Sequence, residues 1–162
     1  MKTITKSRIY LPLAALVLTA TLAIPAAAQQ QTPFKGTFQG NDTVNPMTIS
    51  TNGTGVATHM GQLSLTNVLA LSTLTGTGHW VAANGDSIDT TFVASPDFST
   101  ASLGYITVTE THTITGGTGR FAGARGTFIL ERTHITAPSA DGTHVTFGSF
   151  LHGSITPPGA TH

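Results

Sequence analysis

The sequence predicts a single all-β domain built from about eight strands. Thr, Gly, Ser and Val dominate residues 29–162, whereas Lys, Glu and Gln are scarce, and this composition favours strands over helices. Turn-forming Gly, Asn, Asp and Pro recur at intervals of about 10 to 20 residues. Many short strands separated in this regular way predict a β-sandwich or a β-barrel.

The positions of the turns divide the chain into its expected strands. We place turns at residues 40–42, 52–53, 84–86, 96–97, 116–117 and 141–142. Between them we expect strands near residues 34–40, 46–51, 55–66, 74–83, 87–94, 103–115, 124–136 and 143–156. The two ends, about 29–33 and 157–162, are rich in Gln, Pro and Gly, and we expect them to be loose.

The first 28 residues have the pattern of a secretory signal peptide. Lys2, Lys6 and Arg8 precede a mostly apolar stretch over residues 9–24, and Ala26 to Ala28 provide a small-residue cleavage site. The apolar stretch is shorter than the roughly 20 residues that a membrane span needs. We therefore expect cleavage after Ala28, a secreted or periplasmic protein without a membrane anchor, and one domain over residues 29–162.

Charge and cysteine content narrow the function classes. Residues 29–162 retain four basic and seven acidic side chains, a formal net charge of −3, and the chain contains no cysteine. Nucleic-acid binding needs a basic patch, so we expect no nucleic-acid partner. Disulfides, thiolate metal sites and cysteine nucleophiles are excluded, and stability must come from the core and the sheet.

Alternation of side chains with a period of two assigns faces to three of the expected strands. One face of 103–115 carries Ile106, Val108, Glu110, His112 and Ile114 opposite a row of threonines. In 124–136, Phe128, Leu130, Arg132 and His134 oppose Ile129, Glu131, Thr133 and Ile135. In the last strand we expect Val145, Phe147, Leu151 and Ile155 on one face, with His144, Phe150 and His152 opposite. The 124–136 strand is partly apolar on both faces, so one face would line the interior and the other would pack on a neighbouring subunit.

A glycine-rich segment carries a resemblance to known families. Residues 114–126 read ITGGTGRFAGARG, which resembles the GGTGxFxxARG signature of plant dirigent proteins and the ITGGxGxFxGAxG signature of allene oxide cyclases. The segments ATHMG at 57–61 and AANGD at 82–86 are similar to motifs of bacterial exported proteins of the same barrel superfamily. The resemblance implies an eight-stranded antiparallel β-barrel. Because the related families are often trimers, it also implies a homotrimer.

The physical chemistry of this motif favours a structural role. Its glycines permit positive φ and close approach of strands, Phe121 can plug one end of a barrel, and Arg125 would bond turn carbonyls or face solvent. The structural motif residues are Gly116, Gly117, Gly119, Phe121, Gly123, Arg125 and Gly126. Residues 117–122 also fit a GxGxxA dinucleotide-binding turn, but that turn must open a helix and the residues that follow are strand-like. We therefore predict no bound cofactor.

Two neighbouring residues are the candidate catalytic pair. Glu110 shares an apolar face with His112, and such a pair can move protons near neutral pH if that face lines the barrel. In the alternative, Glu110 is solvated at the barrel mouth or is paired with an arginine. The candidate ligand-binding residues are Arg132, His134, His59 and Phe128. Histidines are numerous, but without an HxH or HExxH spacing we predict no metal site.

Three functions remain open at this point. The first is an exported barrel that binds a small hydrophobic molecule, or orients a reactive one as dirigent proteins do. The second is a cyclase or isomerase that resembles allene oxide cyclase, with Glu110 and His112 in a shaped cavity. The third is a structural, envelope-associated protein whose lumen is filled, for which we expect Phe92, Phe128, Phe147 and Trp80 to be the filling residues. Fold alone does not choose among them.

Overall fold

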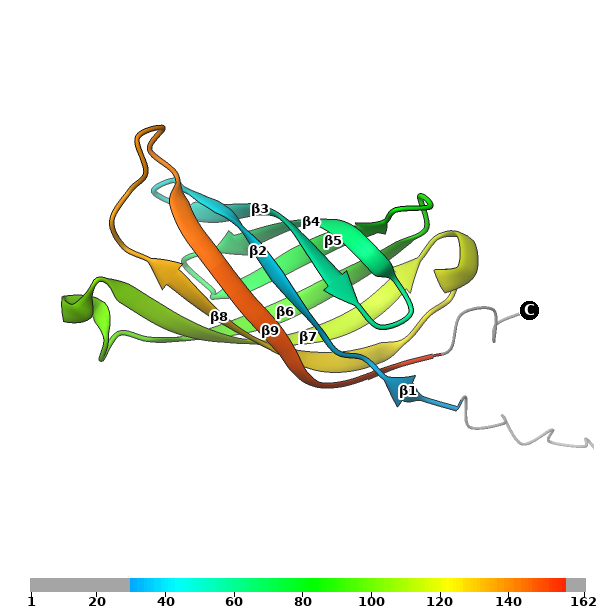
Figure 1. Ribbon diagram of the computed structural model, residues 1–162. Helices are drawn as coiled ribbons and strands as arrows, with labels where there is room; N and C mark the ends of the chain where they lie inside the picture. The colour runs from blue at the N-terminus through cyan, green and yellow to red at the C-terminus, as the bar shows by residue number, and fades with distance from the viewer. Residues whose placement is uncertain (1–29, 157–162) are drawn as a thin grey trace, which may run out of the picture.

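The computed structural model describes residues 30–156 as a closed antiparallel β-barrel (Figure 1). Its eight barrel strands follow one another around the sheet, and β9 pairs with both β2 and β8 to close it. Their bounds are β2 Gly36–Val44, β3 Thr48–Ala57, β4 Gly61–Ala70, β5 Thr75–Ala82, β6 Ser87–Asp97, β7 Tyr105–Gly117, β8 Gly126–Ile135 and β9 His144–Ile155. The all-β class and the eight-stranded barrel expected from the sequence are confirmed.

Three short elements complete the fold. The two-residue strand β1, Thr32–Pro33, pairs with the end of β9, so these two residues are not loose. The 3₁₀ turn η1, Ala101–Leu103, lies between β6 and β7, and η2, Gly119–Phe121, lies between β7 and β8. The expected signal peptide at 1–28 and the tail 157–162 lie outside the described residues.

Four of the expected turns are strand residues: 96–97 and 116–117 are the last residues of β6 and β7, and the other two lie well inside strands. Gly40 to Asp42 lies inside β2, and Asn52 with Gly53 lies inside β3, where Gly40 pairs with Gly53 and Asn41 with Asn52. These glycines mark a close approach of two strands, because a Cβ atom on Gly40 would lie 2.3 Å from the carbonyl oxygen of Asn52. The hairpin turns at residues 45–47 instead. In the same way, the expected strand 55–66 is broken by a turn at residues 58–60.

The faces expected for β7 and β8 agree with the burial that is found, whereas the face expected for β9 is wrong. Val145 and Phe147 are exposed, and Phe150 and Ile155 are both buried. A β-bulge explains the change: Ile129 pairs with His152 and Leu130 with Phe150, so Leu151 is an extra residue. One inserted residue moves all later side chains to the opposite face.

One end of the barrel is filled by aromatic side chains. Phe34, which follows β1, packs 5.1 Å from Phe128 and 6.3 Å from Trp80 between ring centroids. Phe121 from η2 and Phe150 from β9 belong to the same buried cluster. The indole nitrogen of Trp80 donates to Asn67 Oδ1 at 2.9 Å, which satisfies its only polar atom. This end is therefore a packed aromatic core.

Candidate functional site

A layer of charged side chains lies in the middle of the barrel, directly beside the aromatic core. The layer consists of Asp42 from β2, Glu110 and His112 from β7, and Arg132 and His134 from β8. Thr51 and Thr90 add buried hydroxyl groups from β3 and β6. All of these side chains point inward because each occupies the core-facing position of the alternating pattern.

Arg132 is the centre of this layer. Its Nη1 donates to both oxygens of Asp42 at 3.1 and 3.2 Å and to Thr51 Oγ1 at 3.0 Å. Its Nε lies 3.0 Å from Glu110 Oε1. The Nε–H does not point at that oxygen, and neither atom has another partner, so this contact is an ion pair without a hydrogen bond. One guanidinium therefore pairs with two buried carboxylates and balances one of their two negative charges.

Asp42 is an ionised carboxylate. Burial by itself raises its pKa, but the hydrogen bond from His134, the positive charge of Arg132 and the hydrogen bond from Thr51 together outweigh burial. The net result holds the pKa of Asp42 below the ordinary aspartate value. Thr51 Oγ1 donates to Asp42 at 2.6 Å, and His134 Nδ1 lies 2.6 Å from the second oxygen. Since an ionised carboxylate can only accept, His134 Nδ1 carries a proton.

His112 is fixed on four sides. Its ring stacks 4.6 Å from both Phe92 and Phe128, measured between ring centroids. Nε2 lies 3.0 Å from Glu110 Oε2, and Nδ1 lies 3.1 Å from Thr90 Oγ1. Glu110 and His112 are both completely buried. The structure thus brings the candidate catalytic pair together and also pairs Glu110 with an arginine, as the alternative interpretation had proposed.

An apolar pocket occupies the barrel end opposite the aromatic core. Its volume is about 260 Å³, and its walls come from β2, β3, β4, β6, β7 and β8 together with the loops after β4 and β6. The apolar lining residues are Val44, Ile49, Leu69, Leu71, Leu74, Ala94, Pro96, Phe98, Ile106 and Val108. Arg132 and His134 are the two remaining lining residues, and they join the pocket to the charged layer.

The pocket contains only some of the residues that sequence reasoning selected. Arg132 and His134 line it, whereas Glu110 and His112 lie behind Arg132 and do not. Phe128 is part of the aromatic core and contacts His112. His59 lies in the turn between β3 and β4 at the opposite end, where its Nε2 is 3.1 Å from Thr32 Oγ1. Glu110, His112, Phe128 and His59 are therefore not part of the pocket.

Asp42 is the residue of this site that sequence reasoning missed. It follows Gly40 and Asn41, and this run of turn-forming residues suggested a surface turn. A different signal was present: Phe38, Gly40 and Asp42 continue a period of two, which places Asp42 on the same face as the buried Phe38. Its partners, however, come from β3 and β8 and are distant in the sequence.

The glycine-rich motif closes the aromatic end of the barrel and does not reach the pocket. Phe121 is buried in the aromatic core. Arg125 Nη1 donates to the carbonyl oxygens of Thr115 at 2.6 Å and of Ala124 at 2.7 Å, which ties the crossover to β7. Gly119 and Gly123 have positive φ values of 55° and 72°. The motif therefore has a structural explanation within this fold.

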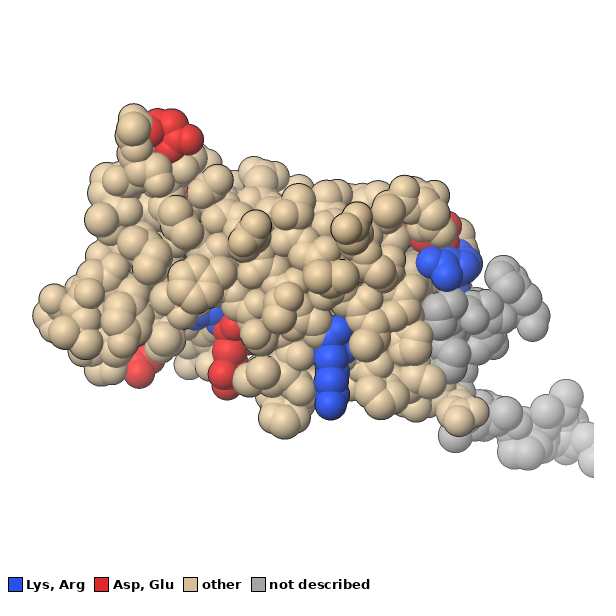
Figure 2. Space-filling model, in the orientation of Figure 1, with Lys and Arg blue, Asp and Glu red and all other residues tan. Residues whose placement is uncertain are grey.

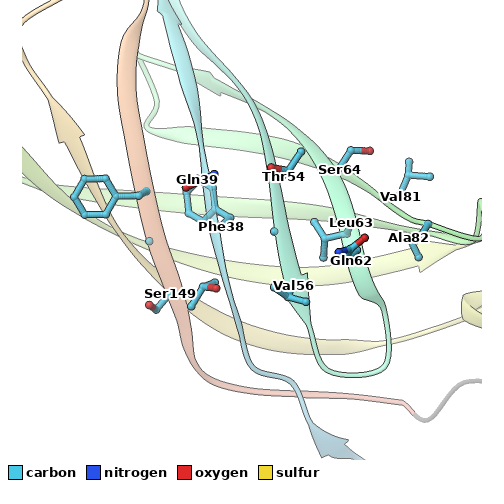
Figure 3. Close-up of a pocket in the computed structure, with 15 residues that line it drawn as sticks. Phe38, Gln39, Thr54, Val56, Gln62, Leu63, Ser64, Val81, Ala82 and Ser149 are labelled. Atoms are coloured by element: carbon cyan, nitrogen blue, oxygen red, sulfur yellow. The ribbon is translucent and has the colours of Figure 1, made fainter.

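The outer surface carries a larger but shallower hollow. It has a volume of about 980 Å³ and lies over β9, β2, β3, β4 and the end of β5 (Figure 3). Outward-facing Gln39, Thr54, Val56, Gln62 and Ser64 line it, and Figure 3 shows their side chains spread along separate strands. No charged side chain lines this hollow, so it has no cluster of polar groups comparable to the charged layer inside the barrel.

The remaining surface offers few charges. Figure 2 shows a few scattered basic and acidic side chains on one face of the molecule, some of them side by side, without a basic patch. Among residues 30–156, no group of three or more His, Asp or Glu side chains has the arrangement of a metal site. Within the same part of the chain, no helix has the length and apolar character needed to cross a membrane.

Comparisons with known proteins add no relative. No family model matches the chain, and no curated protein and no solved structure matches it. The eight-stranded antiparallel barrel implied by the dirigent and allene oxide cyclase signatures is present, but no family or homologue is identified. Function must therefore be argued from the site.

Proposed function

We propose that this chain is an exported barrel that binds one small, largely apolar molecule in the pocket beside the charged layer. The observation that carries the proposal is the division of the lumen. One end is filled by aromatic rings, and the other end holds an apolar pocket of about 260 Å³ whose lining includes Arg132 and His134 of the charged layer. A fully packed structural barrel does not need such a pocket, and an eight-stranded barrel has room for one small ligand.

Burial of the candidate catalytic pair favours binding over cyclase or isomerase chemistry. A general acid or base must come within hydrogen-bond reach of the reacting atom. Neither Glu110 nor His112 lines the pocket, and Arg132, which lines it and contacts Glu110, does not release its proton in proteins. Of the titratable side chains in the layer, only His134 lines the pocket. An enzymatic role would therefore have to begin at His134.

Octanol, a small neutral molecule with an apolar tail, provides a direct test. We expect the full-length protein to bind octanol saturably at one site in isothermal titration calorimetry. Ala94→Phe places a ring in the pocket from the wall of β6, so it should weaken binding at least about tenfold, which corresponds to 1.4 kcal/mol. Val93→Phe adds the same group at the next residue, where the side chain is 58% exposed, and should bind like wild type.

Circular dichroism and thermal melting establish that both variants are folded. If Ala94→Phe is not folded, Ala94→Leu replaces it as a smaller group at the same position. Absence of saturable octanol binding by the wild-type protein would overturn the proposal. Equal binding by the Ala94 and Val93 variants would place the ligand elsewhere and would also overturn it.

A further inference from the structure

We infer that the pocket recognises a small carboxylic acid, with the carboxylate at the charged floor and the apolar tail toward the rim. This inference rests on the proposed function and adds the chemical class of the ligand. It is carried by two nitrogen atoms of residues that line the pocket, and the charge balance of the layer adds the expectation that a proton is taken up with the ligand.

The first step concerns two side-chain nitrogens, on Arg132 and His134, that form no hydrogen bond within residues 30–156 of the protein. Arg132 uses Nη1 for Asp42 and Thr51 and places Nε against Glu110. Among the described residues, neither Arg132 Nη2 nor His134 Nε2 has a hydrogen-bond partner, and neither is among the fully buried unpartnered atoms. Because both side chains line the pocket, these two nitrogens are the polar atoms available to a ligand there.

The second step concerns which ligand group satisfies both nitrogens. Nη2 of a guanidinium can only donate, and His134 Nε2 becomes a second donor when the imidazole is protonated. A carboxylate accepts from two donors at once, and hydrogen bonds between ionised partners are the stronger ones. An alcohol or an ester accepts more weakly and brings no negative charge.

The third step concerns the charge balance of the layer. Asp42 and Glu110 carry two negative charges and Arg132 carries one positive charge when both acids are ionised. With both histidines neutral the layer has a charge of −1, and an added carboxylate would be repelled. Uptake of one proton by a histidine brings the layer to zero charge and removes this repulsion, so binding of a carboxylate should be coupled to uptake of a proton.

His134 is the group placed to take up that proton. Asp42 from β2 holds its Nδ1, and Arg132 lies two residues away on β8. His144 from β9 stacks on it at 5.0 Å between ring centroids, and its Nδ1 lies 3.0 Å from the carbonyl oxygen of Ile135. From β7, Glu110 faces the other side of Arg132, and His112 bonds to Glu110. Among the histidines of residues 30–156, His134 alone lines the pocket and also contacts a buried carboxylate.

The experiment compares octanoate, octanol and methyl octanoate on the full-length protein. Histidine is the side chain that changes charge between about pH 5 and 8, so we measure affinities at about pH 6 and about pH 8. Octanoate remains mainly ionised at both values because carboxylic acids titrate near about pH 4. We expect octanoate to bind at least about tenfold more tightly than octanol at the lower pH, and the advantage to shrink at the higher pH.

Calorimetry in two buffers of different ionisation enthalpy counts the protons directly. We expect uptake of about one proton with octanoate at the higher pH and none with octanol or methyl octanoate. His134→Asn keeps a donor for Asp42 and removes the titrating ring, so it should abolish proton uptake while octanol still binds. His79→Asn is the matched control, because His79 is exposed and paired with Asp89 on the outer surface.

The outcomes separate this inference from the proposed function. If neither octanol nor octanoate binds, both fail. If octanol binds but octanoate binds no more tightly and takes up no proton, the carboxylate inference is overturned and the pocket stands. Loss of proton uptake in His144→Asn but not in His134→Asn would likewise overturn the assignment to His134.

Discussion

Replacing Arg132 with methionine should show how strongly the barrel depends on its charged layer. The guanidinium lies 3.1 Å from Asp42 and 3.0 Å from Glu110, and the three side chains are 3%, 0% and 1% exposed. Methionine retains much of the volume of the side chain but leaves two buried carboxylates without their cation. Removal of one partner from a buried ion pair costs about 3–5 kcal/mol. The free energy of unfolding of a domain is only about 5–15 kcal/mol, so this loss would be a large part of it.

Urea denaturation measures this loss. With a slope of about 2 kcal/mol per molar urea, the midpoint should fall by about 2 M. A neutral triple variant, Asp42→Asn with Glu110→Gln and Arg132→Met, removes the orphan charges and should recover about 2 kcal/mol relative to the single variant. The loss in Arg132→Met should also shrink as the pH falls, because protonation discharges the unpaired carboxylates.

The control is the same substitution at Arg120. Its side chain is 51% exposed and forms a surface pair with Asp86, so Arg120→Met should change the midpoint little. A loss of less than about 1 kcal/mol in Arg132→Met would refute the reasoning, since buried pairs cost more than this to break. A triple variant no more stable than the single one would refute it too, because the loss would then come from packing.

Further predictions concern the aromatic end, the glycine-rich crossover, the acid limb of stability and the assembly. Trp80→Ala should cost about 3–5 kcal/mol in urea denaturation, because the indole is completely buried among Phe34, Phe128 and Phe150. Gly119→Ala should cost more than Gly142→Ala: both have positive φ, but a Cβ on Gly119 would overlap Asp86 Oδ1, whereas at Gly142 it meets open space. The folded-state pKa of Asp42 is lowered, so its stabilisation is present above the unfolded aspartate value of about 4 and is lost as the pH falls through the folded value. Asp42→Asn should therefore flatten the acid limb of the stability curve, which pH titrations of thermal melting can measure. The expected homotrimer stays a prediction, and light scattering on the purified protein measures the mass that decides it.

Local pattern was sufficient for most of the architecture. In β7 and β8 the apolar residues alternate regularly over long stretches, so both the strands and their buried faces could be read from the sequence. The prediction failed where the local signal was misleading. In β2 and β3, glycine and asparagine resemble turn residues, although here the glycines allow two strands to approach closely.

The candidate site was only partly visible in the sequence. Glu110, His112, Arg132 and His134 were selected because polar residues on an apolar face are unusual. The face of β9 could not be predicted, because a bulge at Leu151 inserts one residue. The alternation of apolar and polar residues in β9 gives no sign of this bulge. Asp42 was missed because its role as the buried partner of Arg132 depends on a residue 90 positions away in the sequence.

The eight-stranded architecture, the buried faces of β7 and β8 and the exclusion of disulfides could all be read from the chain alone, because they follow from local periodicity and composition. The contacts of Arg132 with two carboxylates and the apolar pocket at one end of the lumen became visible only in the folded barrel. Those features depend on closure of the barrel, which brings β2, β7 and β8 together across the lumen. Burial then makes each ion pair important for stability, because a charge removed from water costs free energy unless a protein group of opposite charge pairs with it.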